Sequence, residues 1–203
     1  MDSLFGFIQE MCERYTIDES HGLKHAIGTM KRADQMLEQL ENVSEDERRI
    51  TLYAAALHDT CDHKYTDVEE ASTRIREWLL KQAWSQDHVN VLIQIITTMS
   101  YSHVKKLTGY PDHGPWQRAY HVARHADLLE SFIVARCILY DRHIHPERSE
   151  DTHWTRAEEL FRDRVFTYVS EGWIFMEEAL KHVPALEAEA MRCLGERSLD
   201  WNL

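Results

Sequence analysis

Apolar residues recur at three- and four-residue spacing along most of the chain, which is the period of an amphipathic helix. The pattern predicts helices over residues 3–15, 20–40, 44–59, 67–82, 85–99, 116–140, 153–181 and 184–195. The chain has only 7 Gly and 4 Pro, so long helices with short connections are expected. We therefore predict an all-α fold, a single-domain helical bundle over residues 1–203. Its core spans about 18–140, and the helices of 153–195 pack on that core.

Capping residues predict where most of these helices begin. Ser44 with Glu47, and Asp67 with Glu70, match the capping box, in which two side chains satisfy the free N–H groups of a helix start. The remaining start signals, in chain order, are Asp18 or Ser20, then Ser85, then Pro184. Residues 100–115 contain two Gly and two Pro and form the one long irregular segment, which is typical of a lid or binding loop.

Composition narrows the class of protein. Hydrophobic content of 43% and charged content of 29% are ordinary for a soluble globular chain. No run approaches 18 apolar residues, so no membrane-spanning helix is expected, and the N-terminus shows no secretory signal. The four cysteines have no CxxC spacing, which predicts reduced thiols in a cytoplasmic protein. The net charge of −12 argues against a nucleic-acid partner but leaves room for a small phosphorylated substrate.

The segment 51–65, TLYAAALHDTCDHKY, contains the first candidate site. An apolar, alanine-rich helix ends in His58 and Asp59 side by side, with no turn signal before them. A buried charge is costly unless it is paired or bound to a metal. An imidazole and a carboxylate delivered by a rigid apolar helix therefore indicate a metal site, and the 13 histidines of the chain raise that expectation.

Two further segments complete a pattern across the chain. HAIGTMKRA begins at His25, AALHDTCD contains His58 and Asp59, and ARHADLLES contains Asp127. This order and these local contexts resemble the HD-domain phosphohydrolase superfamily, in which four such side chains bind one divalent metal ion. The resemblance covers about residues 18–140. The alternative is that His25, His58 and Asp127 are hydrogen-bonded polar residues of the core.

The resemblance implies a metal-dependent hydrolase. Imidazole and carboxylate ligands together suit Mn²⁺, our first choice, as well as Fe²⁺, Co²⁺, Ni²⁺ or Zn²⁺. HDTCDHKYTD is similar to the HDxxDxK segment of bacterial members that convert nucleoside triphosphates to monophosphates and pyrophosphate. Asp62 would then be the general base and Lys64 a catalytic phosphate contact, or both would be structural loop residues. The family's Asp-Ala-Asp reads His125-Ala126-Asp127 here, which leaves the exact substrate open.

Other residues are candidates for substrate contact. His21 lies one turn before His25 and would contact phosphate or support the ligand, unless it is a surface residue. Lys105 and Lys106, in the Gly/Pro loop, would grip phosphates or be ordinary loop lysines. Arg124 and Arg136 flank the last ligand and would clamp phosphate or pair with a buried carboxylate. Trp173, Phe175 and Tyr168 are expected to be core residues rather than a platform for a base.

Three alternatives to the triphosphate hydrolase remain open. A 5′-nucleotidase, or another phosphomonoester or diester hydrolase, would use the same metal ligands. A two-iron oxygenase of the same fold would need two extra histidines, for which His88 and His103 are the candidates, with His113 and His121 further on. A sensor would bind a nucleotide without turnover.

The apolar C-terminal helices would pack within the chain or form a homodimer.

Overall fold

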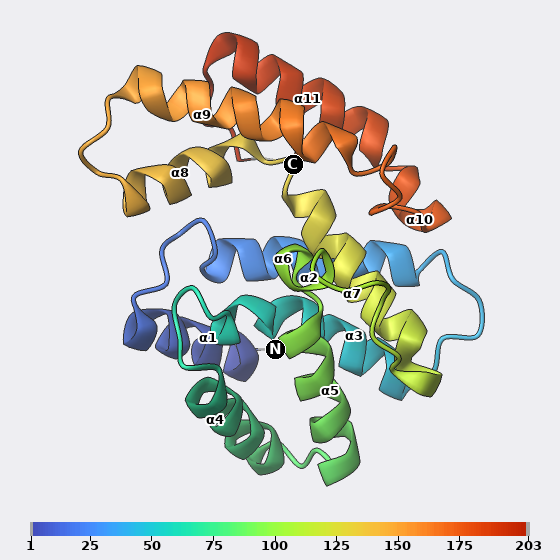
Figure 1. Cartoon of the computed structure of the whole chain (residues 1–203). Coiled ribbons are helices and arrows are strands. Elements are labelled where there is room, and N and C mark those ends of the chain that lie inside the picture. The colour runs from blue at the N-terminus through green and yellow to red at the C-terminus, as the bar shows by residue number, and fades with distance from the viewer. Residues whose placement is uncertain (1, 202–203) are drawn as a thin grey trace.

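All regular structure in residues 2–201, the part of the chain that this computed structural model describes, is helical (Figure 1), and the expected all-α class is confirmed. Up to residue 130 the chain forms what we call the N-terminal bundle. Its elements are α1 Asp2–Tyr15, α2 Leu23–Leu37, α3 Glu45–Leu57, η1 His58–Cys61, α4 Val68–Lys81, α5 Gln86–Thr98, α6 Tyr101–Val104, η2 Gly114–Trp116 and α7 Gln117–Glu130, where η marks a 3₁₀ helix.

The remaining helices form a second unit, which we call the C-terminal layer. It consists of α8 Val134–Ile144, α9 Glu150–Asp163, η3 Val165–Thr167, α10 Glu177–Leu180 and α11 Val183–Glu196. Figure 1 shows this layer lying along one side of the bundle, where α10 contacts α7. Buried side chains of both units belong to one continuous hydrophobic cluster.

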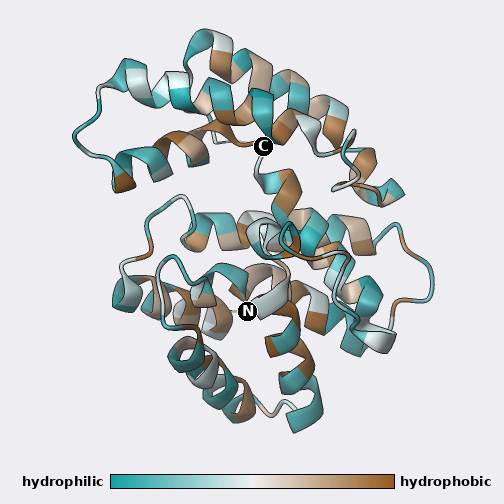
Figure 2. Cartoon of the chain, viewed as in Figure 1, coloured by the Kyte–Doolittle hydropathy of each residue, from teal (hydrophilic) through white to brown (hydrophobic). Residues whose placement is uncertain are grey.

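Small residues bring the three central helices together. Helices α2, α3 and α7 pack against one another, and their contact faces carry buried alanines: Ala26 and Ala33, then Ala54, Ala55 and Ala56, then Ala119, Ala123 and Ala126. Since the separation of packed helices depends on the side chains between them, alanines permit close approach. The longer helices carry both hydrophobic and hydrophilic residues (Figure 2). No helix within residues 2–201 is long and apolar enough to cross a bilayer.

The predicted helix starts at residues 44, 67 and 85 are confirmed. Ser44, Asp67 and Ser85 each accept a hydrogen bond from a backbone N–H two or three residues later. Such a cap is worth about 1 kcal/mol. Glu47 does not complete its capping box, because its carboxylate binds Arg118 of α7 with Nε–Oε1 and Nη2–Oε2 distances of 2.6 and 2.5 Å.

The second predicted helix begins later than expected. It starts at Leu23 with Gly22 in the capping position, so neither Asp18 nor Ser20 caps it. The side chain of Asp18 instead accepts a hydrogen bond from the backbone N–H of Ser20, which forms a local turn. The third helix ends at Leu57, and the chain tightens into η1.

The predicted single helix over residues 116–140 is wrong. The chain breaks at residues 131–133, between α7 and α8. Phe132, Ile133 and Val134 are at most 2% exposed, because this connection passes through the core between the two units. A segment buried on every side has no hydrophobic period, so the break left no mark in the pattern.

The predicted helix over residues 153–181 is also wrong. Helix α9 starts earlier, behind a Ser149 cap, and ends at Asp163. A loop follows, in which the carbonyl of Tyr168 accepts hydrogen bonds from the N–H groups of Trp173 and Ile174. Gly172 supplies the positive φ of 74° that this loop requires. The final helix, with Pro184 in its first turn, is confirmed.

Candidate metal centre

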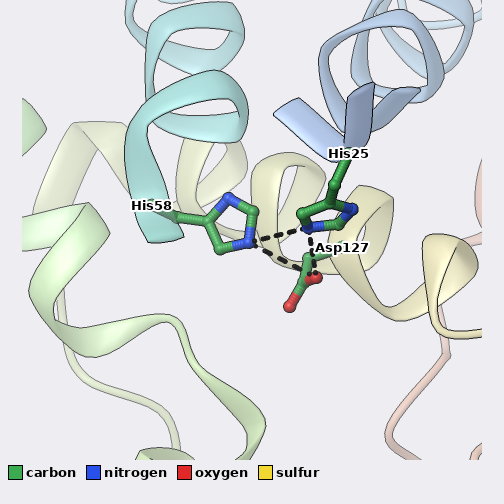
Figure 3. Close-up of side chains that lie close together, drawn as sticks. All are labelled: His25, His58 and Asp127. Atoms are coloured by element: carbon green, nitrogen blue, oxygen red, sulfur yellow. Dashed lines mark hydrogen bonds and ion pairs between the residues drawn. The ribbon is translucent and has the colours of Figure 1, made fainter. Parts of the chain in front are cut away.

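Four side chains from the three central helices converge in the interior. His25 projects from α2, His58 and Asp59 follow α3, and Asp127 projects from α7; Figure 3 shows the first, second and last of these pointing toward one another. The Nε2 atoms of the two histidines are 3.3 Å apart. Asp59 Oδ2 lies 3.1 Å from His25 Nε2 and 3.3 Å from His58 Nε2, and Asp127 Oδ1 lies 3.4 Å from both.

The separations among His25, His58 and Asp127 match the donor atoms of one metal ion, and Asp59 adjoins this group through the two histidines. Nitrogen and oxygen ligands about 2.0–2.2 Å from an ion lie about 3–3.5 Å from one another in tetrahedral or octahedral arrangements. Asp59 Oδ2 is buried and has no hydrogen-bond donor among the described residues. His25, His58 and Asp59 are less than 8% exposed, and the side chain of Asp127 is 19% exposed. The cluster could therefore hold a metal ion.

Neighbouring groups orient both imidazoles. His58 Nδ1 lies 2.9 Å from the carbonyl oxygen of Ala55, so Nδ1–H donates and Nε2 keeps its lone pair for the cluster. His25 Nδ1 lies 3.8 Å from Glu130 Oε2. Arg32 holds Glu130 in place, with 2.5 Å between Nε and Oε1. A Cβ at Gly28 would lie 2.5 Å from Glu130 Oε2, so only glycine leaves room for this carboxylate beside α2.

The cluster attracts positive charge. Burial opposes protonation of His58, but Asp59 and Asp127 outweigh that effect and hold the pKa of His58 well above its usual range. Burial also opposes ionisation of Asp59, yet His58, followed by His21, lowers the pKa of that carboxyl well below its usual range. The pKa of Asp127 is lowered in the same way, against burial and chiefly by His58. Either protons or a cation must offset the two carboxylates.

Two adjoining cavities open beside the cluster. The inner cavity, of about 120 Å³, is lined by three of the cluster residues, His58, Asp59 and Asp127, and by the cations Lys64, Arg136 and Arg164. The outer cavity, of about 260 Å³, shares His58, Asp62, Ser100 and Ser102 with the inner one and ends at Lys106. A molecule next to the cluster would therefore meet positive side chains in an otherwise acidic protein.

Three predicted contact residues line these cavities beside the cluster. Asp62 lines both, and its Oδ2 lies 3.5 Å from Lys64 Nζ. His21 lines the inner cavity, and its Nδ1 is 2.6 Å from Ser20 Oγ and 2.9 Å from the hydroxyl of Tyr65. Burial lowers the pKa of His21, against the charge of Asp59.

Of the remaining candidates for substrate contact, only some line a cavity. Lys106 lines the outer cavity, whereas Lys105 is exposed and lies over the ring of Tyr101 at 5.4 Å. Arg124 is 1% exposed and lines neither cavity; its Nη1 donates to the carbonyl of Trp173 at 3.0 Å. Of the aromatic candidates, Tyr168 is buried, as expected, but Phe175 is 43% exposed.

The extra histidines do not gather into a second centre. Within residues 2–201, His88, His103, His113 and His121 belong to neither group of side chains that could hold a metal ion. His88 lies near the surface beside Trp116, and His113 stacks on Tyr120. The second of the two groups consists of Glu189, Cys193 and Asp200, and Arg192 already contacts all three.

Sequence reasoning missed two residues of this region. Glu130 lies within the apolar run LLESFIVA. A carboxylate among apolar residues could have indicated a buried ion pair. Arg164 lines the inner cavity but fell in the middle of a helix that the structure breaks. Nothing in the local pattern indicated that the chain turns at Arg164.

Comparison with known proteins yields a fold but no family. No family model matches the chain, and no curated protein matches it. A protein from Lactobacillus plantarum, solved as a Northeast Structural Genomics target, is similar in structure with a TM-score of 0.72. The two chains are 18% identical over 98% of this chain and 95% of the other. At this identity the similarity concerns the arrangement of the helices, which extends over both units.

Proposed function

We propose that the protein is an HD-superfamily phosphohydrolase that depends on a divalent metal ion and acts on a small nucleotide. The leading reaction is hydrolysis of a nucleoside triphosphate to the monophosphate and pyrophosphate. The observation that carries the proposal is the convergence of two imidazoles and two carboxylates beside a cavity lined by cations, with 3.1–3.4 Å from each histidine Nε2 to the carboxylate oxygens and to the other Nε2. Metal-dependent hydrolysis of a phosphate ester or anhydride uses both features.

His25, His58, Asp59 and Asp127 would hold the ion, and their mixed nitrogen and oxygen donors suit Mn²⁺ first, then Fe²⁺, Co²⁺, Ni²⁺ or Zn²⁺. When bound, such an ion supplies Lewis-acid polarisation of a phosphoryl oxygen and lowers the pKa of water. Lys64 and Arg136 would hold phosphate oxygens. Lys64 Nζ lies 3.5 Å from Asp62 Oδ2. When Lys64 pairs with a substrate phosphate instead, Asp62 would be free to orient a water molecule for attack on phosphorus.

The test is product analysis on mono-, di- and triphosphate nucleotides with Mn²⁺. The wild type is compared with His58→Ala and Asp59→Ala, and His88→Ala is the control because His88 lies outside the cluster. We expect pyrophosphate release from triphosphates, lost in both cluster variants and kept in the control. Phosphate release from monophosphates would point to a 5′-nucleotidase. Absence of any turnover, with two iron ions per chain, would contradict the proposal in favour of the oxygenase.

A further inference from the structure

Arg164 enters the inner cavity from the C-terminal layer. It is the first residue after α9, and its φ and ψ of −141° and −61° turn the chain out of the helix. It lines the same cavity as Asp59 and Asp127, although it comes from the other unit of the fold. Arg162, two residues earlier, is exposed and pairs with Asp163 instead.

Arg164 differs from the other arginines of its unit in having no carboxylate partner. Between residues 134 and 201 every other arginine forms an ion pair: Arg136, Arg142, Arg148, Arg156, Arg162, Arg192 and Arg197. The two other lysine or arginine residues of the inner cavity also face carboxylates, Lys64 at 3.5 Å from Asp62 and Arg136 at 4.0 Å from Asp59. Within the described residues, the charge of Arg164 therefore stays available to a ligand.

Aromatic residues hold this guanidinium in place. Its Nε donates to the hydroxyl of Tyr168 at 2.8 Å. Its central carbon lies 4.1 Å from the ring centre of Tyr101, in the segment 100–115 that the sequence predicts to be a binding loop. The Tyr101 ring in turn contacts Trp173, with 4.9 Å between the ring centres. An arginine anchored through Nε and one face keeps its terminal N–H groups for an anion.

We infer that Arg164 binds oxygen atoms of a substrate phosphate group other than the one at the metal centre. The inference rests on the proposed function. Each phosphate group beyond the first adds negative charge that needs a further cation, and Arg164 is the cavity cation whose charge no carboxylate offsets. Arg164 therefore selects nucleoside di- and triphosphates over monophosphates, while Tyr101 and Tyr168 position it.

The test measures binding of inorganic pyrophosphate and inorganic phosphate to Mn²⁺-loaded protein by calorimetry, after Mn²⁺ affinity has been measured for each variant. Arg164→Ala should bind Mn²⁺ like the wild type but bind pyrophosphate about 10–100-fold more weakly, the loss expected for hydrogen bonds to a charged group. Its affinity for phosphate should change far less. Added guanidinium should restore part of the pyrophosphate affinity, which a merely structural role would not permit.

Three further variants make the result specific. Arg162→Ala should behave like the wild type, because this neighbouring arginine is exposed. Arg164→Lys should fall between wild type and Arg164→Ala, and Tyr168→Phe should weaken pyrophosphate binding slightly through loss of the anchor. Unchanged pyrophosphate binding in a folded Arg164→Ala would overturn the inference and leave the proposed function intact. Failure of the wild type to bind Mn²⁺ would overturn both.

Discussion

The N-terminal bundle and the C-terminal layer supply different parts of the candidate site. The bundle contributes all four candidate ligands, from α2, from α7 and from η1, which follows α3. The layer contributes Arg136 and Arg164, which reach the cavity from α8 and from the end of α9. The candidate metal ligands therefore all belong to the bundle, while recognition of substrate should depend on both units.

The largest effect is expected when a candidate metal ligand of the bundle is removed. His58→Ala removes one ligand, so bound metal should be lost and kcat/KM should fall by about 10³-fold or more, since a metal ion supplies several kcal/mol of transition-state stabilisation. Metal content by mass spectrometry and turnover on the best nucleotide measure this effect. Arg164→Ala is the matched comparison from the layer. A His58→Ala protein that keeps both metal and turnover would contradict the ligand assignment.

A smaller effect on metal binding is expected when Glu130, which lies beside His25, is changed. Glu130→Gln removes the charge 3.8 Å from His25 Nδ1 and should weaken Mn²⁺ binding about 10–100-fold, as other changes beside metal ligands do. Titration of metal-free protein with Mn²⁺ measures the affinity. Glu158→Gln, on the exposed side of α9, is the control and should have no effect. Equal affinities in the two variants would show that Glu130 does not orient the ligand.

In metal-free protein, the contribution of His58 to stability should fall as pH rises. The raised pKa of His58 means that the folded state binds a proton more tightly than the unfolded state. That stability is fully present below the unfolded value of about 6.5 and is lost as pH rises through the folded value, by at most about 1.4 kcal/mol per pH unit. Urea unfolding from pH 6 upward measures the slope. Saturation with Mn²⁺ should remove the contribution of His58 and so change the slope, and an identical slope with and without metal would contradict this prediction.

The smallest expected effects concern the stability of the two units and test whether they unfold together. Ser85→Ala in the bundle and Ser149→Ala in the layer each remove a helix cap, at a cost of about 1 kcal/mol. Because both units share one hydrophobic cluster, the two variants should shift a single unfolding transition equally. Circular dichroism during urea unfolding would show this. Two separate transitions, with only one shifted by each variant, would mean that the units unfold independently.

The sequence was informative where polar residues mark local structure. The caps Ser44, Asp67 and Ser85 predicted the starts of α3, α4 and α5, and the charged pair His58–Asp59 drew attention to a cluster that the structure brings together. These signals are local. A capping side chain acts within its own turn, and an ionisable pair at the end of an apolar helix stands out without knowledge of its neighbours.

The rest depended on contacts between distant segments. Phe132 and Ile133, in the break after α7, are buried, so the hydrophobic period is lost there, and the turn at Arg164 follows from packing of the layer. Glu130 pairs with Arg32 and approaches α2 only because Gly28 lies opposite. Arg124 adjoined the ligand segment in sequence but projects toward Trp173 instead of the cavity. Only the assembled fold distinguishes these placements.

The central claim is that four side chains of the bundle bind one divalent ion. The most direct measurement is anomalous diffraction from crystals soaked with Mn²⁺, together with the metal content per chain in solution. The account predicts one Mn²⁺ per chain, which His25, His58, Asp59 and Asp127 would hold. A saturated crystal with no anomalous peak among these side chains would show that protons alone stabilise the cluster, and the account would be wrong.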